Sequence, residues 1–495
     1  MKKQLLLTCL ITLSTLFSVA QKDTAYIYTF GGENDEQGRD IELTSDSGFI
    51  MVGSTSSFGA GNSDIYLVKV DSNINYEWSA AIGHEFTEFG HAVKQTADNG
   101  YIICGYTNSI GNGSYDAYLV RTDDKGKLLW EKTFGGFEWD FAYDLEITAD
   151  GGFLIVGETH SLGNGNADAY LIKTDKDGNL LWEKTMGGTG KDIAHALIAT
   201  KDGNFAFCGE NASKNPENKG DAWLVKFDGK GDTLFNVVDV STAETVCYDL
   251  VQSLKDNYTL TGYSTKYNDP IEDLNTIQFD SLGSKNWEKG HGGIFIGSDN
   301  ENDRGLAISH IENNEFWTSG YTQSFGSKVS KDMYLMKLNA EGVYIRGTTY
   351  GNNDLDIAHE LIWLGNESFI LFGESNSYYG KMSSFVLIKF EQFKASYPEV
   401  IDSTQDTQKP VLNSIEEQNE TILIKTFPNP TDNSFEVEGI SNLAHFAIRM
   451  FDNIGREVEF LIEDQLININ HLQTGQYILE LTNSQKKIRL KVFKN

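Results

Sequence analysis

Short apolar runs separated by polar turns recur along most of the chain. Seven of these runs end at a glycine, and the steps between the glycines are 52, 52, 52, 53, 58 and 53 residues. The seven glycines are Gly53, Gly105, Gly157, Gly209, Gly262, Gly320 and Gly373. Self-similarity at such a period indicates a repeat architecture, here with seven copies.

One copy reads as four strands. Residues 144–147 and 153–156 have strand patterns and are separated by Asp150-Gly151-Gly152, a tight-turn signal. Residues 169–174 and 180–185 follow, joined through another turn at residues 175–178. Four antiparallel strands in about 50 residues predict the blade of a β-propeller. A solenoid would need polar capping repeats, and the first and last copies are not unusually polar. The fold class is therefore all-β, with a seven-bladed β-propeller over residues 21–393.

The ends of the repeat region predict how the propeller closes. Residues 28–32 repeat the sequence pattern of residues 132–136, so the first strand of the mature chain has a fourth-strand sequence. The seventh copy ends with its third strand, at residues 385–390. The first strand can therefore complete the last blade and remove two exposed sheet edges. This places Tyr28 beside Leu387.

The two ends of the chain differ in composition from the repeats. Lys2 and Lys3 precede an apolar run at residues 5–17 and the small residues Ser18 and Ala20, which is typical of a signal peptide, residues 1–20. The run is shorter than the roughly 20 residues that span a bilayer, and no later apolar stretch predicts a transmembrane segment. Residues 394–425 are polar and are expected to form a linker.

Four motifs follow the linker, and the last of them is a run of basic residues at the end of the sequence. They are Phe427-Pro428-Asn429-Pro430, Phe451-Asp452-Asn453-Ile454-Gly455-Arg456, Leu472-Gln473-Thr474-Gly475 and Lys486 to Lys494. Residues 426–495 resemble the type A sorting domain of the type IX secretion system of the Bacteroidota. The resemblance implies a small C-terminal β-sandwich that the outer-membrane translocon recognises and removes. It also implies a protein exported through the periplasm and then secreted or held on the outer cell surface. The alternative is an ordinary accessory β-domain.

Charge narrows the range of partners. The chain has 71 Asp and Glu against 40 Lys and Arg, a formal net charge of −31. We do not expect nucleic-acid binding, because phosphate recognition needs clustered basic residues. Cys104, Cys208 and Cys247 lie in or beside apolar strand patterns and are expected to be buried free thiols.

An acidic residue stands 17 or 18 positions before each repeat glycine. These acids, called the ring acids below, are Glu36, Glu88, Asp140, Asp192, Glu244, Asp303 and Asp356. At the start of the innermost strands they could line the axis and bind a cation or a basic peptide. The alternative is that each carboxylate accepts backbone N–H groups at a blade junction, which also explains a repeat in every copy.

Other recurring residues have two interpretations each. His91, His195 and His359 follow ring acids by three positions, and Arg39 and Tyr143 share that position, so all five are expected near the axis. The histidines belong to blades too far apart for one zinc ion. Aspartates of the Asp64 class, before the third strands, fit loop fixing better than calcium. Tryptophans of the Trp78 class fit packing between blades better than ligand stacking.

One loop departs from the repeat. The segment from Trp287 to Asp303 is longer than its counterparts and contains Phe295, Asp299, Asn300 and Glu301. Variable loops on rigid scaffolds often carry binding groups, so Phe295, Asp299, Glu301 and Asp303 are candidate binding residues. Asp299, Glu301 and Asp303 have the spacing that begins a calcium loop, but the glycine comes one position late, at Gly305.

The motifs of metalloproteases, P-loop enzymes and serine hydrolases are missing from the sequence. Two function classes remain. One is a non-catalytic binding protein for an extracellular glycan or protein. The other is a secreted carbohydrate-active hydrolase or lyase that uses carboxylates near the axis. No cofactor is expected apart from the calcium that the long loop and the Asp64 class raise. The other expected partner is the type IX translocon, through the C-terminal domain.

Overall fold

The chain divides into two compact units, residues 1–412 and 413–495, in the computed structural model. In the first unit the structure describes residues 24–217, 219–268, 271–291, 302–324, 330–351, 354–378, 382–391 and 399–402. In the second it describes residues 425–427, 434–438, 447–452, 457–458, 460–463, 466–468, 472, 475–482 and 487–494. Residues 1–20, the predicted signal peptide, lie outside the described residues.

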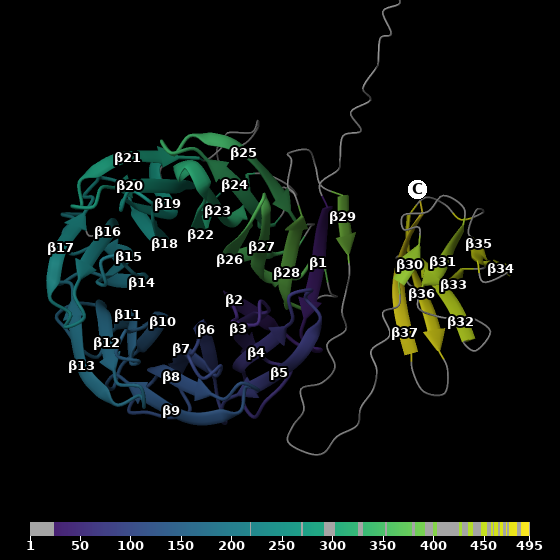
Figure 1. The fold of residues 1–495 in the computed structure, drawn as a ribbon, viewed down its shortest axis with the longest axis horizontal. Helices are drawn as coiled ribbons and strands as arrows, with labels where there is room; N and C mark the ends of the chain where they lie inside the picture. Colours follow the sequence, from purple (N-terminus) through teal and green to yellow (C-terminus); the bar gives the residue numbers. More distant parts are fainter. Residues whose placement is uncertain are drawn as a thin grey trace, which may run out of the picture. The chain divides into compact units, whose positions relative to one another are not determined.

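The first unit is a ring of seven antiparallel sheets around a central axis (Figure 1). The innermost strand of each sheet is the first strand of its repeat, as the spacing predicts. These strands are β2 (Glu36–Leu43), β6 (Glu88–Gln95), β10 (Asp140–Ile147), β14 (Asp192–Ala199), β18 (Thr245–Gln252), β22 (Asp303–His310) and β26 (Asp356–Gly365). The sheets that they begin are numbered here as blades 1 to 7 in chain order.

The outer strands of the blades follow in sequence order. The second strands are β3 (Phe49–Thr55), β7 (Tyr101–Thr107), β11 (Phe153–Thr159), β15 (Phe205–Asn211), β19 (Tyr258–Asn268), β23 (Phe316–Thr322) and β27 (Ser368–Ser375). The third strands are β4 (Asp64–Val70), β8 (Asp116–Thr122), β12 (Asp168–Thr174), β16 (Asp221–Phe227), β20 (Ile271–Phe279), β24 (Asp332–Leu338) and β28 (Ser384–Glu391). The fourth are β5 (Tyr76–Ile82), β9 (Leu128–Phe134), β13 (Leu180–Met186), β17 (Thr233–Val238), β21 (Lys285–Gly290) and β25 (Tyr344–Tyr350). A short 3-10 segment, η1 (Glu312–Asn314), precedes β23.

The closure predicted from the repeat register is confirmed. β1 (Thr24–Phe30) pairs antiparallel with β28, and Tyr28 lies opposite Leu387. A further strand, β29 (Glu399–Asp402), pairs in parallel with β1, so blade 7 has five strands. β29 lies within the segment that composition predicts to be a linker.

The aromatic residues of the fourth strands pack against the next blade, which confirms the prediction for the Trp78 class. The ring centroids of Trp78 and Tyr101 are 5.7 Å apart, and those of Trp130 and Phe153 are 6.2 Å apart. The turn of the next blade lies over the indole. At Gly126, where φ is +75°, an added Cβ would stand 2.6 Å from the Trp78 ring, so this position needs glycine. Cys104, Cys208 and Cys247 are buried free thiols, also as predicted.

A bulge interrupts every innermost strand at the same place. In blade 1 the register shifts between Gly38 and Asp40, so Arg39 has no partner on β3. The other six blades shift at the equivalent position. A bulge bends its strand and redirects one side chain. Seven side chains are thereby turned out of the blade ladders near the axis.

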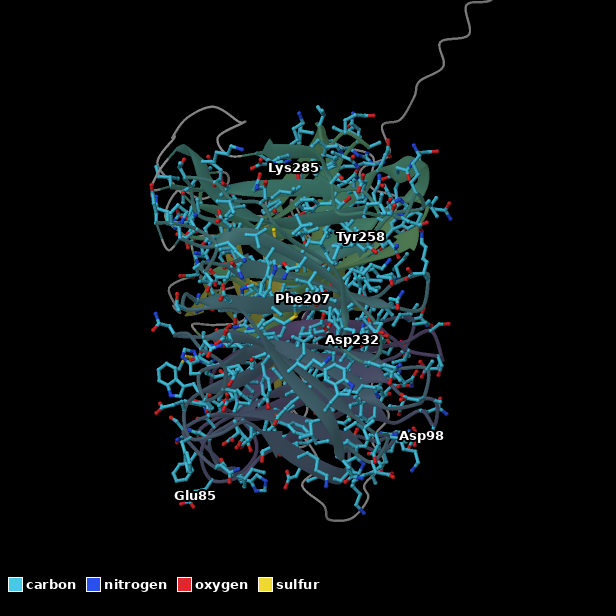
Figure 2. All side chains as sticks on the ribbon, turned by 90° about the vertical axis from the view of Figure 1, so that its left-hand side faces the viewer. Glu85, Asp98, Phe207, Asp232, Tyr258 and Lys285 are labelled. Carbon is cyan, nitrogen blue, oxygen red and sulfur yellow. The ribbon has the colours of Figure 1, made fainter. Side chains whose placement is uncertain are left out.

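The propeller has two flat faces, seen edge-on in Figure 2. Glu85, just before β6, and Asp98, just after it, lie at opposite edges of this view. We call the face at which the innermost strands begin, marked by Glu85, the proximal face. The opposite face, marked by Asp98, is the distal face.

The second unit contains two four-stranded sheets. One has the order β30 (Lys425–Phe427), β31 (Ser434–Glu438), β35 (Leu466–Asn468), β34 (Leu461–Glu463). The other has the order β33 (Glu457–Val458), β32 (Ala447–Asp452), β36 (Gly475–Thr482), β37 (Lys487–Lys494). Buried residues come from both sheets, including Met450, Ile467 and Leu479, as in a β-sandwich. Over the described residues of the whole chain, no helix is long and apolar enough to cross a membrane.

Candidate functional site

The ring acids that begin the innermost strands are buried behind the proximal surface. Glu36 accepts hydrogen bonds from the Gly32 amide at 3.0 Å and the Thr55 hydroxyl at 2.8 Å. Glu88, Asp140 and Asp192 likewise accept one amide from the residue four positions earlier, and Asp303 and Asp356 accept a Thr or Ser hydroxyl from the paired strand. All six are at most 2% exposed. These contacts are those of the alternative in which the carboxylates fix blade junctions.

Blade 5 differs from the others. Thr245, opposite Ser264, occupies the position that the ring acids have in the other blades, and the two hydroxyls are 3.0 Å apart. Glu244 precedes this position by one residue and is half-buried. Its carboxylate accepts a hydrogen bond from the Tyr263 hydroxyl at 3.0 Å. The spacing of 18 before Gly262 thus marks an acid that stands one residue before the junction position, which Thr245 occupies.

The long loop before Asp303 lies almost entirely outside the described residues. This includes Phe295, Asp299, Asn300 and Glu301, so those predictions stay predictions. Among the described residues no group of three or more His, Cys, Asp or Glu side chains could hold a metal ion. In blades 1 to 3 the aspartate that begins the third strand fixes the preceding loop through two backbone amides. Asp168, for example, accepts the amides of Asn164 at 2.8 Å and Gly165 at 3.1 Å. This confirms the loop-fixing interpretation of these residues.

The seven bulged residues form a ring around the axis, which we call the axial ring. Its members are Arg39, His91, Tyr143, His195, Tyr248, Leu306 and His359. Neighbours in the ring contact one another: the centroid distances are 5.1 Å for His91 and Tyr143, 5.6 Å for Tyr143 and His195, and 5.0 Å for His195 and Tyr248. Arg39 bonds His359 across the junction of blades 7 and 1. The predicted axial position of the five named residues therefore agrees with these contacts.

A second ring lies just outside the first. We call it the flanking ring. Each member follows a repeat glycine and pairs across strands with the second residue of the innermost strand. Its members are Ser54, Tyr106, Glu158, Glu210, Tyr263, Tyr321 and Glu374. Residue type differs from blade to blade in both rings, whereas the glycines and junction acids scarcely change. The positions that maintain the fold carry the same residue type in nearly every blade. The variable positions are therefore where one blade can differ chemically from another.

Blade 3 presents a buried carboxylate with spare hydrogen-bonding capacity. The Tyr143 hydroxyl donates to Glu158 Oε1 at 2.7 Å. Glu158 is only 7% exposed. Its other oxygen, Oε2, is buried and has no hydrogen-bond partner among the described residues. A buried carboxylate oxygen without a donor is costly, which favours a ligand or water donor at this point.

Blade 4 continues this polar surface. Lys191 Nζ donates to Glu210 Oε1 at 2.6 Å, and His195 Nε2 lies 3.9 Å from the same oxygen. His195 Nε2 is buried and has no hydrogen-bond partner. Burial, with Lys191 and Arg304 nearby, lowers the pKa of His195 to about 3, so the ring is neutral at physiological pH. Burial also raises the pKa of Glu210, against the opposing effect of Lys191.

Two aromatic residues beside this surface are exposed. Phe137 and Trp139, just before β10, are 84% and 50% exposed. The counterparts of Phe137 in the neighbouring repeats are Glu85 and Thr189, and those of Trp139 are Thr87 and Lys191. The Trp139 ring lies edge-on to Phe141 at 6.4 Å and to Tyr115 at 6.5 Å. Its indole N–H donates to Ser114 at 2.9 Å. We call Tyr115, Phe137, Trp139 and Phe141 the aromatic surface.

Cationic side chains gather in blades 6 and 1. Arg304 donates to both oxygens of Glu272, at 2.5 and 2.6 Å, and lies 4.4 Å from the centroid of Tyr263. Lys331 Nζ lies 3.9 Å from the centroid of Tyr321. Arg39 Nη1 lies 3.6 Å from Glu374. The proximal face is thus aromatic and acidic on blades 2 to 4 and cationic on the other side of the axis.

In four of the seven blades the residue after the bulge is a carboxylate, and these four lie deeper along the axis. Three of them accept an amide of the following blade: Asp40 from Val93 at 2.8 Å, Asp144 from Leu197 and Asp249 from Ile308, each at 2.7 Å. The fourth, Glu360, bonds its own neighbour's amide instead. Their charged neighbours are Glu42, Lys94 and Glu146. Burial and mutual repulsion raise the pKa of Asp40 to about 6 and of Asp249 to about 7, and raise those of Asp144 and Glu360.

We expect these four carboxyls to stabilise the propeller more in mild acid than in mild base. Because their pKa values are higher folded than unfolded, they bind more protons in the folded state, and their contribution to stability rises as the pH falls from about 8 to 5. The lowered pKa values of His195 and His359 act in the opposite direction on the total stability. We expect Asp249→Asn to raise the thermal midpoint at pH 8 by a few degrees, since about 1 kcal/mol moves a midpoint by roughly 2–4 °C. The gain should vanish at pH 5. Thermal unfolding at both pH values measures this.

Asp150→Asn is the matched control. Hydrogen bonds from Thr148 and the Gly152 amide, with Lys173, lower the pKa of Asp150 to about 2. This variant should gain nothing at pH 8. Equal pH profiles for wild type and Asp249→Asn would contradict the role of the axial carboxyls.

A closed ring of seven blades, six of four strands and one of five, defines the first unit as a β-propeller. Residues 425–495 match the family model described as the secretion system C-terminal sorting domain, which confirms the resemblance seen in the motifs. The chain is therefore a propeller protein that carries a secretion sorting domain.

The solved structures to which the chain is similar share little sequence with it. One is PorZ of Porphyromonas gingivalis, described as a bacterial surface component of the type-IX secretion system: 11% identity, 94% of this chain and 60% of that chain covered, TM-score 0.42. A protein of unknown function from Dyadobacter fermentans has 11% identity, coverages of 74% and 97%, and a TM-score of 0.42. The propeller of the Trilobed protease from Pyrococcus furiosus has 12% identity, coverages of 78% and 100%, and a TM-score of 0.40.

One curated protein matches part of the chain. The regulatory protein FlaEY of Caulobacter vibrioides is 25% identical over 165 residues, which covers 28% of this chain and 17% of that protein. At these identities and scores, none of the likenesses assigns a ligand.

The residues of the two rings were only partly foreseeable. The spacing from the ring acids leads to the axial ring, and the sequence predicted five of its members there. The flanking ring and the aromatic surface were missed. The sequence does contain a signal for both. Their residues occupy repeat positions at which the residue type changes from blade to blade, and each lies next to a position that stays the same.

Proposed function

We propose that the protein binds a glycan on the proximal face of the propeller, across blades 2 to 4. The observation that carries the proposal is that the exposed aromatic surface lies next to Glu158, whose buried Oε2 has no donor among the described residues: Phe141 stacks on Tyr143 at 6.2 Å, and Tyr143 donates to Glu158. These two features match the two properties of a sugar, whose ring has apolar C–H faces and a rim of hydroxyl groups.

The aromatic surface suits the apolar face of a sugar. Aromatic faces carry negative charge density and attract C–H groups that are made partly positive by neighbouring oxygens. Trp139 and Phe137 are held at the blade 3 junction by the strand that begins at Asp140. A rigid platform of this kind lowers the entropy lost on binding.

The polar groups suit the hydroxyl rim. Glu158 Oε2 can accept a hydroxyl proton, and neutral His195 can accept or donate at Nε2 according to its tautomer. A ligand that fills both bonds removes the cost of leaving two buried polar atoms unpaired. A protein ligand is the other binding class, and its interface would need a surface larger than these few residues.

Hydrolysis is the second candidate function. Glu158 and Glu210 occupy the same flanking position in adjacent blades, and the raised pKa of Glu210 suits a proton donor. A pair of carboxylates in unlike environments is what glycoside hydrolysis requires. Release of reducing sugar by wild type but not by Glu210→Gln would establish this function in place of simple binding.

Trp139→Ala tests the binding proposal. We expect glycan affinity to fall about tenfold or more, since an aromatic contact contributes about 0.5–1.5 kcal/mol beyond its buried area. Glycan-array screening of the propeller, followed by titration calorimetry of the hits, measures the change. Leu282→Ala is the control, because Leu282 is 80% exposed but lies in a turn on the distal face. Equal loss in both variants, or an array without hits, would contradict the proposal.

We also propose that the sorting domain directs the protein through the type IX route to the outer cell surface or the medium. The match over residues 425–495 supports this route. A strain lacking type IX secretion should retain the protein in the periplasm, and the parent should export a form without the C-terminal domain. Mass spectrometry of cell fractions tests this. An uncleaved periplasmic form in the parent would contradict it.

A further inference from the structure

We infer that the glycan is anionic, and that Lys331 together with Arg39 and Arg304 receives its carboxylate on the side of the axis opposite the aromatic surface. This inference rests on the proposed glycan site and specifies the class of its ligand. Three cations lie together here although the chain as a whole has a formal net charge of −31.

Of the three cations, Lys331 is the one whose charge is most available to pair with a ligand carboxylate. Its ammonium contacts the face of Tyr321 at 3.9 Å, and among the described residues no carboxylate lies within ion-pair distance of it. In the other blades the same repeat position, just before the third strand, is occupied by Ser63, Tyr115, Ala167, Gly220, Glu272 and Ser383. A lysine at this position is therefore particular to blade 6 and is not required by the fold.

Carboxylates do not cancel this charge. Glu272 is held by both forks of the Arg304 guanidinium, and Glu374 lies 3.6 Å from Arg39 and 3.6 Å from His359. Burial and Arg39 lower the pKa of His359 to about 4, so it adds no charge at neutral pH. Among the residues that the structure describes here, three cations thus face two carboxylates. Burial, with Arg304 nearby, lowers the pKa of Lys331, as expected for a cation short of counter-charge.

The placement of these cations also limits the size of the ligand. In a seven-membered ring, blade 6 lies across the axis from blades 2 and 3, which carry Tyr115 and Trp139. A ligand that touches both must cross the axial ring, where His195 and Tyr143 offer polar contacts. A monosaccharide cannot do this, so the ligand is an oligosaccharide with an acidic residue at the blade 6 end.

Matched pairs of sugars test the inference. The probes are oligogalacturonate and its methyl ester, and sialyllactose and lactose, each titrated against the propeller and its variants. In at least one pair the acidic member should bind wild type tenfold or more tightly than the neutral one. Lys331→Gln should reduce the acidic member to the affinity of the neutral one. Added salt should weaken only the acidic member.

Two variants separate this inference from the proposed function. Lys214→Gln, an exposed lysine on the proximal face of blade 4, should leave both members unchanged. Trp139→Ala should weaken both members alike. Equal binding of acidic and neutral sugars, or an unchanged preference in Lys331→Gln, would overturn the anionic ligand and leave glycan binding in place. Failure of every sugar to bind would overturn both.

Discussion

A chain that begins at Gly31 is expected to unfold at a far lower temperature than one that begins at Gln21. The deletion removes β1, whose Ala25, Ile27 and Phe30 are fully buried, and exposes the outer edge of β28. Burial of one large apolar side chain contributes roughly 1.5–3 kcal/mol. With the backbone pairing that is lost as well, we expect a loss of at least about 5 kcal/mol, which is comparable to the whole stability of many domains.

Complementation makes this experiment specific. A synthetic peptide of residues 21–32 should bind the truncated chain by strand addition and restore most of the thermal midpoint. The same peptide with Ile27→Asp is the control and should restore nothing. A truncated chain that unfolds at the wild-type temperature would show that β1 does not close the ring.

Asp140→Ala is expected to destabilise the propeller by about 3 kcal/mol or more. Its carboxylate accepts the Gly136 amide at 2.8 Å, the Ser161 hydroxyl at 2.7 Å and the Thr159 hydroxyl. The substitution leaves all three donors without that acceptor, and each buried unsatisfied group costs about 1–3 kcal/mol. Chemical denaturation, with equal slopes for both proteins, measures the difference.

Glu244→Ala is the matched control for this prediction. Glu244 belongs to the same sequence class of acids but is half-buried and accepts one side-chain hydrogen bond, from Tyr263. Its loss should cost less than about 1 kcal/mol. If the two substitutions cost the same, the acids at the blade junctions would not be the structural residues that their contacts indicate.

The sequence predicted the architecture well because each blade of a propeller repeats the same pattern of apolar runs, turns and glycines. Apolar runs that end at Gly157 or Gly209 give strand number and spacing, and the fourth-strand pattern at residues 28–32 gives the closure. Thr245 shows where such reasoning fails. Only the cross-strand register reveals that Glu244 stands one position away from the junction. An acid at nearly the expected spacing is enough to conceal the substitution.

The candidate site was harder to predict for a geometric reason. Glu158, Trp139 and Lys331 are distant in sequence, and the bulge in every innermost strand turns the axial ring toward the centre. A pattern of residues along one strand does not tell which neighbours from six other blades come into reach. The flanking ring becomes visible once the blades are superposed and the positions that change are separated from those that repeat.

The pairing of Tyr28 with Leu387 also governs the order in which the ring can assemble. These residues are 359 positions apart, whereas almost every other strand pair in the propeller is a local hairpin. Local pairings form quickly, and a contact of such high sequence separation must await closure of the whole intervening chain. Blades 1 to 6 can thus mature in turn while β28 keeps an open edge. We expect this pairing to form late, and until β1 has paired with β28 the open edge leaves the chain more exposed to proteolysis.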